Sequence, residues 1–187
     1  HSGFWRCRQP VDTLPGTDVR SLWCADSEMT MTEHEILQRL TALCSRSEQC
    51  THDVREKMRR WGVDDDMPQR VVESLQRDRY VDDVRYCRMF VRDKINFSKW
   101  GRRKIESALY AKRIDGDTVS SILDEVTDDD YLRVLRPLLA AKRRTIKADN
   151  DWERDAKLAR FALGRGFTYD LIRPLLKGDV ECEDNVD

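Results

Sequence analysis

The feature that most constrains the fold of this chain is a repeat with a period of about fifty residues. Three short junctions resemble one another, Trp61-Gly62-Val63, Lys112-Arg113-Ile114 and Arg165-Gly166-Phe167, and each precedes a helical pattern. Val63 and Ile114 stand 51 residues apart, and Ile114 and Phe167 stand 53 residues apart. A period of this length that contains three helical patterns predicts an array of small helical units, in which each core packs against its neighbours.

Within each unit, apolar residues recur every three or four positions, which is the spacing of one helix face. The middle unit is the clearest case, because its first helical pattern ends in a break from Asn96 to Gly101 and a second pattern follows. The stripe of the first pattern consists of Val84, Cys87, Val91 and Ile95. We expect helix caps at Asp82, at Asp117 and at Ser47 or Thr51. We also expect Pro137 to kink or split the first helix of the last unit.

The sequence therefore predicts an all-α protein, built as a tandem array of three three-helix repeats that form an elongated, curved molecule. The expected repeats span residues 32–80, 81–127 and 128–178. The alternative is one irregular helical bundle without an internal repeat.

Residues 1–31 and 179–187 lie outside this pattern. We expect the first segment to be a disordered leader or a non-native extension, with Met29 or Met31 as a plausible start, because it lacks sustained periodicity and the apolar core of a signal peptide. The alternative is a docking arm that uses Phe4, Trp5 and Trp23. The last segment holds five acidic residues and no cation, which predicts a solvated, disordered tail.

Composition restricts the classes of function open to the chain. The formal net charge is −1, so any contact with a polyanion must come from a local basic patch. No run of about 18 apolar residues is present, which argues against a membrane span. The six cysteines include no C-x-x-C pair and are expected to be reduced, as in a cytoplasmic protein.

Candidate catalytic and metal-binding motifs are weak. Neither a glycine-rich phosphate loop nor a zinc-type cluster occurs, and His34 and His52 have no evident nucleophile partner. Asp82 and Asp83 resemble a metal carboxylate pair, but adjacent helical residues do not face each other, so a cap with a first-turn acid is the better interpretation. Tyr86 and Phe90 could stack on bases or form a core pair. We predict no catalytic residue, cofactor or metal.

Cations gather in two stretches of the second and third units. Such clusters suit nucleic-acid phosphates or an acidic protein surface, with an affinity that depends on salt. The alternative is that they are solvated helix faces paired with nearby carboxylates. The third helices offer few Arg, Lys, Asn or Gln side chains for base edges, so sequence-specific reading is not expected. The candidate contact residues are Arg92, Lys94, Lys99, Arg102, Arg103, Lys104, Lys142, Arg143 and Arg144.

These motifs resemble those of the RecX family, the regulators of RecA recombinase. The resemblance covers roughly Thr32 to Leu176, and its central motif combines charged, aromatic and glycine positions in a fixed order. Arg113 departs from the family, which often has glycine there. The residues that carry the resemblance are Arg46-Ser47-Glu48, Val54 to Met58, Tyr80 to Asp83, Arg85-Tyr86, Phe90-Val91, Trp100-Gly101, Arg103 to Ile105, Leu158, Phe161, Arg165 to Phe167 and Ile172.

The resemblance implies a crescent of helical repeats that lies in the groove of a RecA–DNA filament and inhibits the recombinase, with no reaction of its own. It implies RecA filaments and the DNA within them as partners, with weak direct DNA binding at most, and a cytoplasmic monomer. The alternatives are a sequence-tolerant DNA-binding protein that acts without RecA, and a helical interaction scaffold.

Overall fold

The computed structural model describes residues 31–63 and 66–176, and in these residues it has nine helices and no strand. The predicted tail and residues 1–30 of the predicted leader, with Phe4, Trp5 and Trp23, lie outside the described residues. The expected all-α class and the array of three-helix units are confirmed, while the curved outline and the unit boundaries stay predictions. Within the described ranges, no helix combines the length and the hydropathy needed to cross a bilayer.

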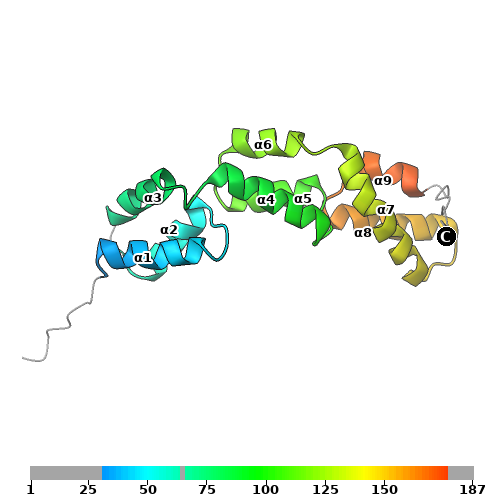
Figure 1. Ribbon diagram of the computed structural model, residues 1–187. Coiled ribbons are helices and arrows are strands. Elements are labelled where there is room, and N and C mark those ends of the chain that lie inside the picture. Colours follow the sequence, from blue (N-terminus) through cyan, green and yellow to red (C-terminus); the bar gives the residue numbers. More distant parts are fainter. Residues whose placement is uncertain (1–30, 64–65, 177–187) are drawn as a thin grey trace, which may run out of the picture. The chain divides into compact units, whose positions relative to one another are not determined.

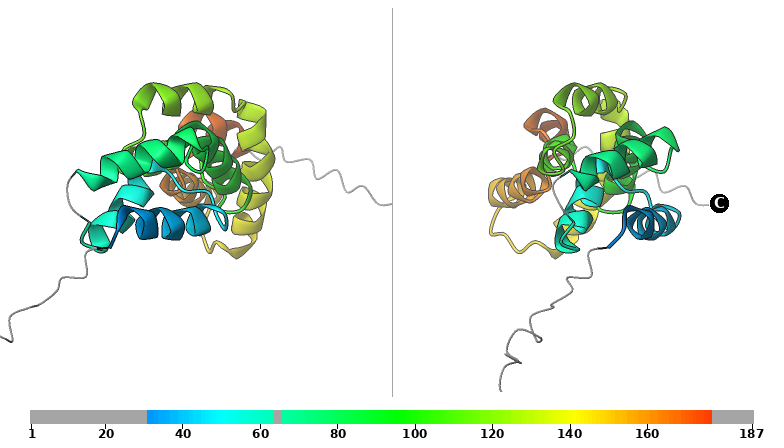
Figure 2. Two further views of the ribbon diagram at one scale, coloured as in Figure 1. Left: turned by 60° about the vertical axis from the view of Figure 1, so that its left-hand side comes forward. Right: turned by 90° about the vertical axis from the view of Figure 1, so that its left-hand side faces the viewer.

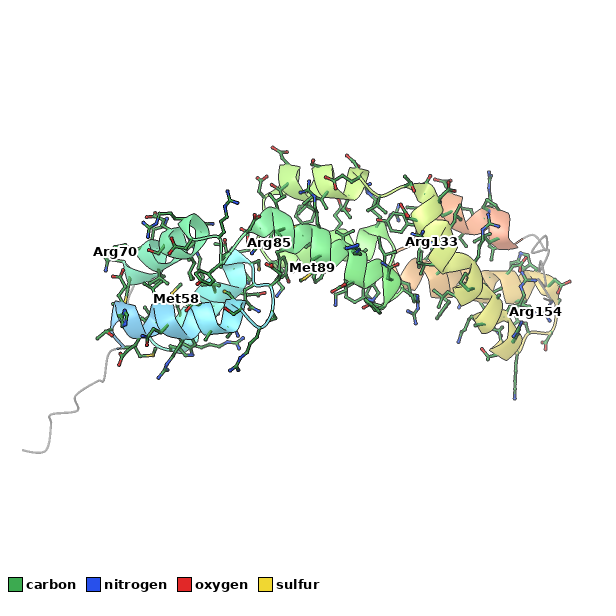
Figure 3. The ribbon with its side chains drawn as sticks, viewed as in Figure 1. Met58, Arg70, Arg85, Met89, Arg133 and Arg154 are labelled. Carbon is green, nitrogen blue, oxygen red and sulfur yellow. The ribbon has the colours of Figure 1, made fainter. Side chains whose placement is uncertain are left out.

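The first three helices enclose a core of their own. Helix α3 contacts both α1 and α2, and the side chain of Met58 is fully buried at their centre (Figure 3). The helices are α1 (Glu33–Cys44), α2 (Thr51–Arg60) and α3 (Met67–Arg77). The core residues are Ile36, Leu40, Val54, Met58, Val71, Val72, Leu75 and Val81. Each helix contributes a one-sided apolar stripe, as the periodicity predicts.

The remaining six helices form two further groups that share one continuous core. The helices of each group contact one another, and α4 also contacts α7 (Figures 1 and 2). The second group is α4 (Asp83–Asn96), α5 (Arg102–Ala111) and α6 (Gly116–Asp124). The third group is α7 (Asp128–Thr145), α8 (Asp151–Gly164) and α9 (Tyr169–Leu176). Because buried side chains from both groups belong to one cluster, these two units pack as one hydrophobic body.

Capping explains where several helices begin. The Asp82 carboxylate accepts a hydrogen bond from the Arg85 backbone N–H at 2.9 Å, as predicted for the start of α4. Thr127 forms a capping box with Asp130 at the start of α7. The prediction for α6 is wrong by two residues, because Asp115 is the cap and accepts from the Thr118 N–H at 3.0 Å. Asp117 lies in the first turn, where its charge still favours the helix.

The start of α2 depends on the second group. The predicted caps, Ser47 and Thr51, are wrong, because the capping position is Cys50 and its side chain makes no capping bond. Instead the Thr51 N–H donates to the Asp83 carboxylate of α4 at 2.7 Å. An ion pair of 2.6 Å between Lys112 and Asp53 also joins the two groups. The Asp83 carboxylate therefore supplies the hydrogen-bond partner that no neighbouring side chain in sequence provides for the Thr51 N–H.

Two further local expectations differ from the structure. Val84, in the first turn of α4, is 41% exposed although it shares the apolar stripe of this helix. Pro137 does not split α7, which runs from Asp128 to Thr145, while the alternative of a kink at this residue stays a prediction. Pro137 lies on the exposed side of this helix, so water can satisfy the carbonyl that loses its amide partner.

The three junctions that define the sequence repeat adopt the same turn. Their central residues, Gly62, Arg113 and Gly166, have φ angles of 70°, 53° and 89°. In each case this residue follows a helix, and its N–H donates to a carbonyl three residues earlier. This is the left-handed residue that commonly ends helices. Arg113 adopts the conformation without being glycine, at a cost of about 1 kcal/mol.

The end of α8 meets the start of α5 in a direct backbone contact. The Gly101 N–H donates to the Arg165 carbonyl at 2.9 Å, and the Arg103 N–H donates to the Gly166 carbonyl at 3.1 Å. A Cβ atom at Gly101 would lie 2.3 Å from the Phe167 backbone N, and one at Gly166 would lie 2.5 Å from the Lys104 backbone N. Backbone N–H groups at the start of α5, which have no partner within their own helix, thus donate to backbone carbonyls at the end of α8. The dipoles of these two helix ends also attract each other.

We predict that Gly101→Ala lowers the free energy of unfolding by about 3 kcal/mol, because the new methyl group must displace backbone atoms of the neighbouring unit. Urea denaturation followed by circular dichroism measures the change. Gly164→Ala is the matched control, since a methyl group there would meet nothing within 4 Å and alanine favours a helix. Equal stability of the Gly101 and Gly164 variants would show that the contact does not form.

We also predict that Arg113→Gly raises the free energy of unfolding by about 0.5–1 kcal/mol, because glycine adopts a positive φ without a steric penalty. Ala111→Gly, two residues earlier in helical conformation, should lower it by up to about 1 kcal/mol. The urea midpoints of the two variants should therefore move in opposite directions, and a decrease for both would refute this account of the turn.

Candidate functional site

The nine candidate cations lie on three helices and one connecting turn of the second and third groups. Two belong to α4, one to the turn after it, three to the first turn of α5 and three to the last turn of α7. In that order they are Arg92 and Lys94, Lys99, Arg102 to Lys104, and Lys142 to Arg144. Their surroundings differ, and this difference separates structural cations from those available to a partner.

Arg102 and Arg143 hold the fold together. Arg102 donates to the Asp124 carboxylate at 2.6 Å and to the Leu123 carbonyl at 3.0 Å, and so ties α5 to the end of α6. Arg143 donates to Asp155 at 3.0 Å and to the carbonyl of the last residue of α9 at 2.9 Å. Both guanidinium groups therefore have internal partners, and neither is a good candidate for binding a partner molecule.

Lys94 and Lys104 rest on aromatic rings. The Nζ atom of Lys94 lies 5.0 Å from the ring centroids of both Phe90 and Trp100. The Nζ atom of Lys104 lies 4.7 Å from the Trp100 centroid. Ring faces attract ammonium groups without neutralising their charge, so both cations are positioned and remain able to bind an anion.

Phe161 of α8 holds two further cations. Lys142 Nζ lies 5.1 Å from its ring centroid, and the Arg165 guanidinium carbon lies 4.9 Å from it. Arg165 also donates to the Ser98 carbonyl at 3.1 Å, across the contact between α8 and α5. Sequence reasoning did not select Arg165 as a contact residue, although the junction motif Arg165-Gly166-Phe167 contained it. That motif was the signal that could have found it.

The remaining candidates make few contacts with other side chains. Lys99 has a φ angle of 56°, and its ammonium group donates to the Asn96 carbonyl. Arg92, Arg103 and Arg144 are exposed. We use the name junction cations for Lys94, Lys99, Arg103 and Lys104, which lie at the end of α4 and the start of α5. This site is distinct from the three repeat junctions described above. Within residues 31–63 and 66–176, none of these four forms an ion pair.

A pocket of about 550 Å³ lies between α4, α6 and the start of α7. Arg85 and Met89 of α4 and Arg133 of α7 line it (Figure 3). Its other lining residues are Arg88, Val91, Arg92, Ile95, Asn96, Ile122, Glu125, Val126 and Asp130.

Carboxylates neutralise most of the arginines around this pocket. Arg85 pairs with Glu48 at 2.7 Å, Arg88 with Glu125 at 2.8 Å, and Arg133 with Asp130 at 2.7 Å. The hydrogen bond from Arg88 lowers the pKa of Glu125, which favours the charged form of this acid. Among the arginines that line the pocket, only Arg92 lacks an ion pair in the described part of the chain.

Metal-type clusters and activated thiols are not found among the described residues. No three of their His, Cys, Asp and Glu side chains are placed to hold a metal ion. Burial raises the pKa of the Cys50 thiol to about 12 and that of Cys87 to about 11, so neither is a ready nucleophile. Tyr86 is buried and stacks on Phe90 at 5.8 Å, which places this aromatic pair at the core rather than on a binding surface.

Comparison with known families gives two matches in succession. Residues 82–123 match the model of the second three-helix domain of RecX, and residues 128–176 match the model of the third. The first range covers α4, α5 and all of α6 but its last residue, and the second covers α7 to α9, so they include the contact between α5 and α8 and the junction cations.

Several curated relatives carry the name Regulatory protein RecX. The protein of Oceanobacillus iheyensis is 25% identical over 155 residues, which are 83% of this chain and 54% of the relative. That of Clostridium botulinum is 30% identical over 134 residues, 70% of this chain and 61% of the relative. That of Clostridium acetobutylicum is 28% identical over 137 residues, 71% of this chain and 63% of the relative. The chain thus spans little more than half the length of these relatives.

Two solved structures share the fold. The crystal structure of RecX from Lactobacillus salivarius has a TM-score of 0.68 and 21% identity, and the match covers 77% of this chain and 94% of that chain. A second, described as a crystal structure of regulatory protein RecX, has a TM-score of 0.71 and 17% identity and covers 87% of this chain and 79% of that chain. At these identities the likeness shows the arrangement of helices.

We predict that Arg102→Ala lowers the free energy of unfolding by about 1–2 kcal/mol, because it removes two hydrogen bonds that join α5 to α6. Arg103→Ala, at the exposed neighbour, should change it by less than about 0.5 kcal/mol. Urea denaturation of the two variants tests this division between structural and available cations. Equal effects would contradict it.

Proposed function

Because this chain belongs to the RecX family, we propose that it is a regulatory protein that binds filaments of RecA recombinase on DNA and restrains their activity. The observation that carries the proposal is the match of two consecutive three-helix domains, which include the junction cations. In this proposal the protein acts in the cytoplasm as a monomer, in the regulation of DNA repair and the SOS response. It performs no reaction of its own.

The junction cations supply the physical basis of binding. A recombinase filament on DNA offers phosphates and acidic side chains, and both attract ammonium and guanidinium groups. Lys94 and Lys104 are already oriented by Trp100, so less side-chain freedom is lost when they bind than for unsupported lysines. Affinity for the filament should therefore fall as salt is raised.

A second candidate is direct, sequence-tolerant binding of DNA without RecA. The observation that favours it is that the junction cations form no ion pair within the described ranges, because phosphates alone could satisfy them. A gel-shift with DNA alone separates the two functions. Tight binding at physiological salt supports the second candidate, whereas binding that requires RecA supports the first. A general helical scaffold, the third alternative, has no observation of its own in its favour.

We predict that the full chain inhibits RecA-driven strand exchange and ATP hydrolysis when it is present below the concentration of RecA. The physical reason is that a ligand bound along a filament blocks several subunits or promotes their loss. Both activities are measured over a wide range of concentrations. Two unchanged activities over that range would refute the proposed function.

The charge dependence of inhibition is tested with the double variant Arg103→Gln and Lys104→Gln. The control is Arg59→Gln with Arg60→Gln, which removes the same charge from adjacent residues of α2. We expect about tenfold weaker inhibition and a shallower salt dependence for the first variant only. Arg102 is left unchanged, because its loss would weaken the fold itself. Equal inhibition by the two double variants would remove the junction cations from the binding site.

A further inference from the structure

Phe97 is exposed to solvent and lies between Lys94 and Lys99 in sequence, two of the junction cations. The side chain of Phe97 is 81% exposed at the end of α4, and among the described residues only Trp152 is an equally exposed large hydrophobic side chain. An aromatic ring in water gives up the free energy that burial would provide. Single exposed hydrophobic residues are common, so exposure alone assigns no role to Phe97.

The turn that carries Phe97 is held on both sides. The Phe97 N–H donates to the Asp93 carbonyl at 2.9 Å, and the Trp100 N–H donates to the Lys94 carbonyl at 3.0 Å. From the third group, Arg165 donates to the Ser98 carbonyl at 3.1 Å. Contacts from α4 and α8 therefore fix the backbone on which the ring stands. A partner that buries the ring would lose little free energy to ordering this turn.

Several cations without ion pairs in the described residues are close to Phe97 in sequence, and one acid, Asp93, lies one helical turn before it. Lys94 and Lys99 lie three and two residues from it in sequence, and Arg103 and Lys104 follow in the first turn of α5. Earlier along the same helix, Arg85 and Arg88 are paired with carboxylates. The exposed ring thus stands at the end of α4 where the cations lack ion pairs, and this coincidence is what points to a partner.

We propose that Phe97 is the anchor of a protein interface, which inserts its ring into an apolar pocket bordered by carboxylates on a subunit of the filament. This inference rests on the proposed function, and it adds the residue that carries most of the contact energy. Interfaces are dominated by a few aromatic and arginine side chains that become desolvated at their centre. The junction cations would surround the ring and pair with the carboxylates of the partner.

The neighbouring rings favour a protein partner over single-stranded DNA. Proteins that bind single strands stack successive bases on several aromatic faces along a basic groove. Here the ammonium groups of Lys94 and Lys104 lie over the rings of Phe90 and Trp100. Cations therefore lie over Phe90 and Trp100, and Phe97 is the one largely exposed ring of these three. A single exposed ring suits insertion into a pocket better than the stacking of consecutive bases.

The test compares Phe97→Ala with Trp152→Ala. Both side chains are 81% exposed, and they lie near opposite ends of α8, so the pair matches in exposure and differs in position. Binding of the full chain is measured on RecA filaments assembled on oligothymidine with a slowly hydrolysed ATP analogue. We expect Phe97→Ala to weaken binding by about 10- to 30-fold, Trp152→Ala to change it by less than about twofold, and Phe97→Leu to retain most of it.

Each other result overturns the inference in a distinguishable way. If the wild-type chain binds filaments and Phe97→Ala binds equally well, the anchor is wrong while the proposed function stands. If the wild-type chain does not bind filaments, the proposed function and the anchor fall together. If Phe97→Ala weakens binding to oligothymidine alone as strongly as binding to filaments, the ring stacks on bases instead. Circular dichroism melts of each variant verify that the fold is intact.

Discussion

The structure depends on one contact between helix ends, in which the carbonyls that end α8 accept hydrogen bonds from the amides that begin α5. The contact needs Gly101 and Gly166, because a methyl group at either position would overlap backbone atoms of the other unit. It joins the second and third groups, which also meet where α4 contacts α7 and which share one continuous core. It also positions Arg165 against the turn that follows α4, so the third group helps to hold the turn that carries Lys99 and Phe97.

Charge in this protein is divided between two uses. Most arginines near α4 and α6 pair with carboxylates and contribute to the fold, as Arg102 and Arg88 do. Lys94 and Lys104 rest on Trp100 instead, and a ring face leaves their charge available. A chain with a net charge of −1 can therefore still present a local basic surface.

Sequence reasoning predicted what repeats along the chain and missed what depends on neighbours in space. The left-handed junctions at Gly62, Arg113 and Gly166 were visible as an aligned motif, and the buried stripes of α4 and α6 followed from periodicity. The start of α2 was not predictable, because its amide partner is Asp83 in another unit. The roles of Arg102 and Arg143 were missed for the same reason. Their carboxylate partners are 22 and 12 residues away in sequence, and no local pattern connects them.

The sequence by itself determined the helical class, the fifty-residue repeat and the supply of cations, because helix formation and periodic burial depend on residues within one or two turns of each other. The tertiary structure alone decided which of those cations are engaged and which remain available. It also decided that Phe97 would stand exposed on a turn held by α8. These outcomes depend on distances between residues of different helices, and only the packing of one helix against another sets such distances.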